Sequence, residues 1–174
     1  MLLIERVKET EFLAREFLLW LWYNSEVNGG TYKLEDGDVE LWVDKKIVLR
    51  HDDDEGTEKI VFTGDNLNLK EARFALMEKK QVTESQLRLK VEENEYSFTI
   101  DSEWMNIKTL KTPKVKQDIK EDPEGIFYEK MFLIEQAISA IDTIYGEFIE
   151  LRLSPAWNDS VKPALLNWIS QVKE

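Results

Sequence analysis

The spacing of apolar residues changes along the chain, and each spacing predicts a kind of element. Residues 11–26 contain seven successive apolar side chains, at 17–23, which leave a helix no polar face. Thr10 is a suitable N-cap for this helix, and the Asn-Gly-Gly sequence at 28–30 is a typical stop. We therefore expect a first helix that is buried on most sides.

Alternation of apolar and polar residues then predicts strands. Residues 39–43 and 47–49 flank the polar triplet 44–46, which indicates a hairpin, and residues 59–62 predict a third strand. The period of two identifies this part of the chain as sheet.

A short amphipathic helix is expected over residues 67–80. Its inner side would hold Leu69, Ala72, Leu76 and Met77. Residues 86–91 and 96–100 alternate again around a polar turn, and residues 107–110 predict one more strand. A polar connector, residues 114–125, leads to the last third of the chain.

The last third predicts helices. Apolar residues recur there at alternating steps of four and three, which gives a heptad-like seam along one long helix. The seam consists of Phe127, Met131, Ile134, Ile138, Ile141, Tyr145 and Phe148. It can close against helices of the same chain or against a second copy in a homodimer, and the first helix's own need for a partner favours the internal contact. Residues 161–172 predict a final helix.

These elements predict an α+β fold, with an antiparallel sheet of about five strands packed by the buried N-terminal helix and a C-terminal helical pair. The chain has 174 residues, a usual length for one domain. We expect a single domain over residues 1–174, with the first helix, the sheet and its inserted helix in residues 1–112 and the C-terminal helices in 123–174.

Composition removes several kinds of chemistry. The chain has no Cys and one His, which excludes disulfides, thiolate nucleophiles and Cys/His zinc sites. No apolar run approaches the ~20 residues of a membrane span. Charged residues interrupt the apolar start before a signal sequence forms. We expect a cytoplasmic protein without a membrane partner.

Two acidic clusters invite a metal interpretation. Residues 51–55 read HDDDE, but they lie between predicted strands and lack the spacing of a calcium loop, so we interpret them as a solvated hairpin turn. Asp65, Glu78 and Lys80 have the acid and lysine content of a metal-dependent nuclease, which is our third hypothesis. Without a Gly-x-Ser-x-Gly elbow or a glycine-rich phosphate loop, we expect no enzyme, no metal and no cofactor.

The net charge of −12 opposes simple electrostatic affinity for nucleic acid. Acid is concentrated in residues 35–58 and 117–174, however, and the middle of the chain is neutral to slightly basic. Lysines gather there at Lys108, Lys111, Lys114, Lys116 and Lys120. They form either a solvated strand edge or a track of contacts to backbone phosphates.

Six tryptophans divide into two groups. Trp20 and Trp22 lie in the buried helix and are expected in the core. Trp42 and Trp104 fall at strand positions, where they either join the core or stay exposed for a partner. The candidate partner interface consists of Trp42, Trp104, Phe127, Met131 and Ile134.

Three segments carry a family resemblance. Residues 71–83 read EARFALMEKKQVT, residues 96–101 read YSFTID, and residues 107–111 read IKTLK. Their order resembles the C-terminal part of RdgC-type recombination-associated proteins, and FLAREFLLWLW at 12–22 with FIELRLSPAW at 148–157 is similar to bacterial relatives of that family.

This resemblance implies a dimeric, non-enzymatic protein that occupies double-stranded DNA without sequence preference and restrains the recombinase RecA. By resemblance, Lys80, Lys108 and Lys111 are positions of DNA contact. Our leading hypothesis is therefore sequence-independent DNA association in recombination or mobile-element biology. The alternative is an acidic protein-interaction module that does not bind DNA.

Overall fold

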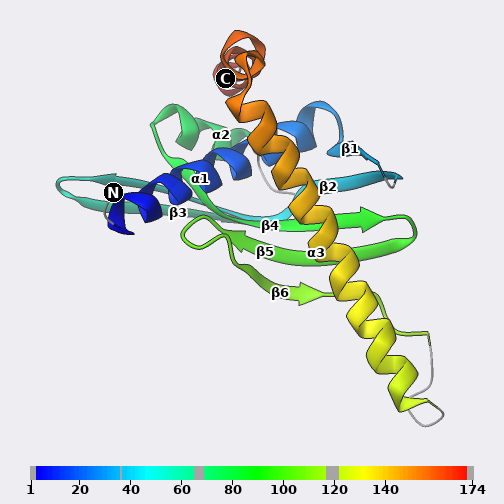
Figure 1. Cartoon of the computed structure of the whole chain (residues 1–174). Helices are drawn as coiled ribbons and strands as arrows, with labels where there is room; N and C mark the ends of the chain where they lie inside the picture. Colours follow the sequence, from blue (N-terminus) through cyan, green and yellow to red (C-terminus); the bar gives the residue numbers. More distant parts are fainter. Residues whose placement is uncertain (1–2, 36, 65–68, 117–121, 172–174) are drawn as a thin grey trace.

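The computed structural model describes residues 3–35, 37–64, 69–116 and 122–171, with the backbone alone for 3–11, 53, 69 and 70. Figure 1 shows the chain in these elements. They are α1 (Leu3–Val27), β1 (Thr31–Leu34), β2 (Gly37–Asp53), β3 (Gly56–Thr63), α2 (Leu69–Met77), β4 (Gln81–Val91), β5 (Asn94–Asp101), β6 (Ile107–Lys111), α3 (Pro123–Leu153), the π-helical turn η1 (Trp157–Val161) and α4 (Lys162–Ser170).

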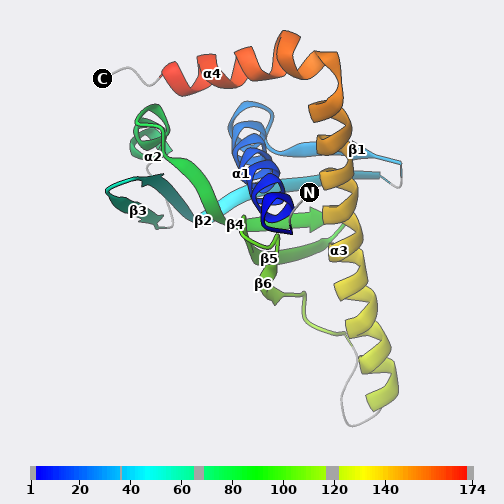
Figure 2. The same cartoon turned by 60° about the vertical axis from the view of Figure 1, so that its left-hand side comes forward.

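Within the described residues, six strands form one antiparallel sheet in the order β1–β2–β4–β5–β6, and β3 pairs with the second half of β2. Helices α1 and α3 lie on one side of this sheet (Figures 1 and 2). Their aromatic rings meet there. The predicted α+β class and antiparallel sheet are confirmed. In the described part of the chain, no helix is long and apolar enough to cross a membrane.

The core lies between α1, α3 and the sheet. Leu87 and Leu89 of β4 and Phe98 of β5 turn inward on alternate residues and are fully buried. Phe17 of α1 packs against Phe148 of α3 with their ring centroids 5.3 Å apart and the rings tilted by 50°. The prediction that α1 is buried on most sides is confirmed, and Trp20 and Trp22 lie in the core as expected.

Helix α1 begins earlier than the sequence predicted and ends where it predicted. The N-cap at Thr10 is wrong, because residues 3–10 contain neither Gly nor Pro and the helix continues through them. At the other end, the amide of Gly30 donates to the carbonyl of Asn24 at a φ of +70°. A Cβ at Gly30 would lie 2.2 Å from the carbonyl oxygen of Leu41, so only glycine fits.

The hairpin predicted around residues 44–46 is wrong, because β2 runs through that triplet as one strand. The pairing with β4 shifts register between Val43 and Ile47, so the triplet forms a bulge. Cross-strand ion pairs hold Asp44 and Lys46. Strand β2 instead forms hairpins with β1 and with β3, and the hairpin with β1 was not predicted.

Other boundaries moved by a few residues. Helix α2 is shorter than expected, and Met77 is half exposed while Ala75 occupies the inner side. Pro123 is in the first turn of α3 rather than in a connector, with Asp122 as N-cap. The predicted residues 67–68, the side chain of Leu69 and Val172 lie outside the described residues.

A partly buried carboxylate joins three helices. Glu26 of α1 accepts hydrogen bonds from the indole nitrogens of Trp22 at 2.9 Å and of Trp168 in α4 at 3.0 Å. Arg73 of α2 places its guanidinium 5.3 Å from the centroid of the Trp168 ring and 3.8 Å from Glu26. This cluster fixes α2 and α4 against the C-terminal end of α1.

Candidate nucleic-acid interface

The side of the sheet facing away from α1 and α3, here called the open face, is polar. Arg88 and Lys90 of β4 alternate with the buried Leu87 and Leu89 and are partly exposed. Arg88 lies opposite Ser97 of β5, so the two neighbouring strands present polar side chains on the same face. This face is where nucleic-acid contacts from the central strands would form.

A bulge in β6 brings two lysines to the open face. In a regular strand, residues three apart point to opposite faces. Here Lys108 lies opposite Thr99 and Lys111 lies opposite Ser97, so β6 advances three residues while β5 advances two. Thr109 takes up the extra residue at a φ of +53°, a costly conformation for a β-branched side chain.

The positive charge of Lys108 is balanced by a neighbouring carboxylate. Its ammonium nitrogen lies 2.8 Å from Oδ2 of Asp101, whose side chain is nearly buried at the end of β5. This contact raises the pKa of Lys108. Burial alone would raise the pKa of Asp101, but the ion pair with Lys108 and the backbone N–H of Trp104 together lower it. Lys108 is thus an unsuitable free phosphate contact at neutral pH.

Three further cations of the open face also have acidic partners across the strands. The pairs are Lys46 with Glu84 at 2.5 Å, Arg88 with Asp44 at 3.2 Å, and Lys90 with Glu40 at 4.0 Å. The middle of the open face therefore carries balanced charge rather than a positive patch. Arg88 and Lys90 were not among the sequence candidates, although the alternation in β4 places both opposite to its leucines.

Lys80 is a structural lysine. Its side chain is 7 % exposed, and the ammonium nitrogen lies 2.9 Å from Glu58 and 3.2 Å from Glu78. The hydrogen bonds that its ammonium group donates to these two carboxylates raise its pKa. Its expected place among accessible DNA-contacting lysines is therefore wrong. Glu78 is occupied by the same contact, and the proposed nuclease partner Asp65 lies outside the described residues.

Three lysines remain accessible at the end of the sheet. Lys111, Lys114 and Lys116 are exposed, and in the described part of the chain no carboxylate forms an ion pair with any of them. We call residues 111–116 the lysine segment. The backbone N–H of Lys116 donates to Glu129 of α3 at 3.0 Å, which holds the segment beside the first turns of that helix. Lys120 lies outside the described residues.

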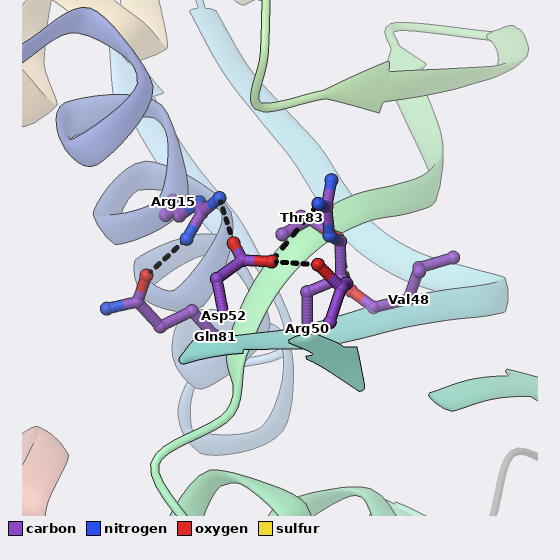
Figure 3. A network of polar contacts seen from close by, with 7 residues as sticks. Arg15, Val48, Arg50, Asp52, Gln81 and Thr83 are labelled. Carbon is purple, nitrogen blue, oxygen red and sulfur yellow. Dashed lines mark hydrogen bonds and ion pairs between the residues drawn. The ribbon is translucent and has the colours of Figure 1, made fainter. Parts of the chain in front are cut away.

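The acidic sequence 51–55 forms the end of the β2–β3 hairpin, as expected. Asp52 lies between the guanidiniums of Arg15 and Arg50 (Figure 3). The hydrogen bond from Thr57, together with these two cations, holds the pKa of Asp52 below its ordinary value. Asp52 therefore holds the hairpin against α1. Among the described residues, no cluster of acidic or histidine side chains has the geometry to hold a metal ion.

The candidate partner residues are partly or largely accessible. Trp104 is 61 % exposed, Trp42 is partly exposed opposite Arg88, and Phe127, Met131 and Ile134 are exposed on α3. The heptad seam changes character along α3, because Ile141 and Phe148 are buried in the core while the earlier positions face outward.

The site thus combines an accessible lysine segment with a charge-balanced open face and an exposed apolar stretch of α3. No protein-family model, no curated protein and no solved structure matches this chain.

Proposed function

We propose that this protein associates with double-stranded DNA without sequence preference and without catalysis, through the lysine segment at the edge of the sheet. The observation that carries the proposal is the accessibility of Lys111, Lys114 and Lys116, whose ammonium groups have no acidic partner among the described residues. The resemblance of residues 71–111 to RdgC-type proteins supports the same function.

The geometry suits contacts to phosphates better than contacts to bases. The segment continues an edge strand and has no described element between it and solvent, so its ammonium groups can follow a backbone. Lys90 can also contact a phosphate at a low cost in free energy, because its ion pair with Glu40 spans 4.0 Å and both side chains are about half exposed. The acidic remainder of the surface repels DNA and so confines binding to this edge.

The test compares two variants of equal net charge in a mobility-shift experiment at low salt. Changing Lys111, Lys114 and Lys116 to Glu should abolish the shift of duplexes of unrelated sequence. The matched control changes three exposed lysines on other elements to Glu: Lys33, Lys59 and Lys162. The control should keep most of the binding. Equal losses in both variants, or no shift with the unaltered protein, would remove the proposal.

The second candidate function is an acidic protein-interaction module. The observation that favours it is the group of large apolar side chains exposed on the first half of α3. A protein partner that stays bound after nuclease treatment, together with no affinity for duplex DNA at low salt, would establish this function in place of the first.

A further inference from the structure

Helix α3 exposes an apolar stripe where it leaves the sheet. The helix has 31 residues and its N-terminal half reaches past β6 (Figures 1 and 2). Six large apolar side chains on this half are between 36 % and 62 % exposed: Phe127, Tyr128, Met131, Phe132, Ile134 and Ile138. Apolar side chains at this density are unusual on a surface that faces only water.

The exposed area is close to what a specific interface needs. An aromatic side chain carries about 150–250 Å² of surface. Phe132 does not share the helix face of Phe127, Met131, Ile134 and Ile138, so the other five side chains leave roughly 400 Å² of apolar area open to a partner on each copy. Burying it in two copies removes about 800 Å², and the flanking polar residues bring the total near the lower limit of about 1,000 Å² for specific protein interfaces.

The stripe has the spacing of a two-stranded coil. Phe127 and Ile134 occupy d positions of a heptad, and Met131 and Ile138 occupy a positions. The next d residue, Ile141, is 3 % exposed because it packs into the core of its own chain. The intermolecular seam therefore has four layers, and beyond it each helix returns to its own sheet.

Charges beside the seam select the direction of the partner helix. Lys130 is at a g position and Glu135 is at the following e position, and both are exposed. In a parallel pair, g of one helix lies beside the next e of the other, so Lys130 meets Glu135 twice. In an antiparallel pair, e faces e and g faces g, so Lys130 no longer lies beside Glu135, and the e positions Tyr128, Glu135 and Asp142 offer no positive charge.

We propose that two copies of this chain associate in parallel through the apolar stripe of α3, with Lys130 of each copy paired to Glu135 of the other. The lysine segment stays outside this contact, because Lys116 is bonded to Glu129 at an f position on the opposite side of the helix. Dimerisation and DNA binding can therefore be tested independently of each other.

Sedimentation velocity over about 1 to 100 µM tests the association, since interfaces of this size bind in that range. The unaltered chain should dimerise, and Lys130→Glu should weaken the dimer roughly tenfold by replacing two attractive pairs with two repulsive ones. The double change Lys130→Glu with Glu135→Lys should restore it. The control Lys33→Glu, which changes an exposed residue of β1 by the same charge, should leave it unaltered.

Cysteine cross-linking tests the direction, helped by the absence of cysteine from the chain. Phe127→Cys and Ile138→Cys, each alone, should form an intermolecular disulfide on oxidation, because every seam residue faces its own copy in a parallel pair. Cross-linking only when the two variants are mixed would establish an antiparallel pair and overturn the proposal. A monomer at every concentration would also overturn it.

Discussion

Replacing Asp101 with Asn should strengthen DNA binding while weakening the fold. Asp101 holds Lys108 on the open face through the 2.8 Å ion pair, and Lys108 is about half exposed. Asn keeps a side-chain oxygen for the backbone N–H of Trp104, which now donates to Asp101 at 3.1 Å. The substitution therefore removes the charge and leaves the turn intact.

The size of the effect follows from the geometry. Two unit charges 4 Å apart in water interact by about 1 kcal/mol. A carboxylate beside Lys108 therefore disfavours the binding of a DNA phosphate there by a similar free energy. Its removal should tighten duplex binding about fivefold and steepen the salt dependence by about 0.9. The lysine of the lost ion pair is about half exposed to solvent, which screens the pair, so its loss should lower the free energy of unfolding by only about 0.5–1 kcal/mol.

The stability loss should depend on pH in a defined direction. The pKa of Asp101 is lower in the folded protein than its ordinary value of about 3.9. Its ionised form therefore stabilises the fold above that value, and the benefit disappears as pH falls through the folded pKa. Urea denaturation should separate Asp101→Asn from the unaltered protein at pH 7 and bring them together under strong acid.

Fluorescence anisotropy of a labelled duplex measures the binding, with Asp159→Asn in η1 as the control of equal charge. If Asp101→Asn loses stability but binds DNA no better than this control, Lys108 does not face the nucleic acid. The open face beside β6 would then have no part in binding.

Other substitutions separate structural from functional roles. Glu26→Gln should lower the free energy of unfolding by about 2 kcal/mol in urea, because one buried indole N–H loses its acceptor; an unchanged midpoint would contradict the three-helix cluster. Lys80→Met should lower the urea midpoint yet leave duplex affinity unaltered, and a selective loss of affinity would return Lys80 to the binding surface. Thr109→Gly should leave thermal stability nearly unchanged, since relief of the positive φ offsets the greater entropy of glycine, whereas Thr99→Gly in regular strand should cost about 1 kcal/mol.

The elements that could be predicted are those with a strong local period. The alternation in β4 and β5 and the four-three spacing in α3 each place one face of an element in the core, and that requirement is visible in the sequence. Residues 44–46 were misread because three polar residues resemble a turn. Only the acids and bases of the neighbouring strand reveal that they continue β2.

The accessibility of the candidate site residues depends more on contacts between residues far apart in the sequence. Lys80 is buried because Glu58 of β3 reaches it, and Lys108 is neutralised by Asp101 of β5, so neither state follows from local sequence. The bulge at Thr109 is defined only by its register against β5. The lysines are visible in the sequence, but which of them keep an accessible charge depends on these contacts.

The most direct test of DNA association is the dependence of duplex affinity on salt concentration. Each phosphate contact contributes about 0.9 to the slope of log affinity against log salt. Changing Lys111, Lys114 and Lys116 to Gln should therefore reduce the slope by about 2 to 3, while Gln at Lys33, Lys59 and Lys162 should reduce it by less than about 0.5. Equal slopes for the two variants, or no binding by the unaltered protein at low salt, would contradict the account.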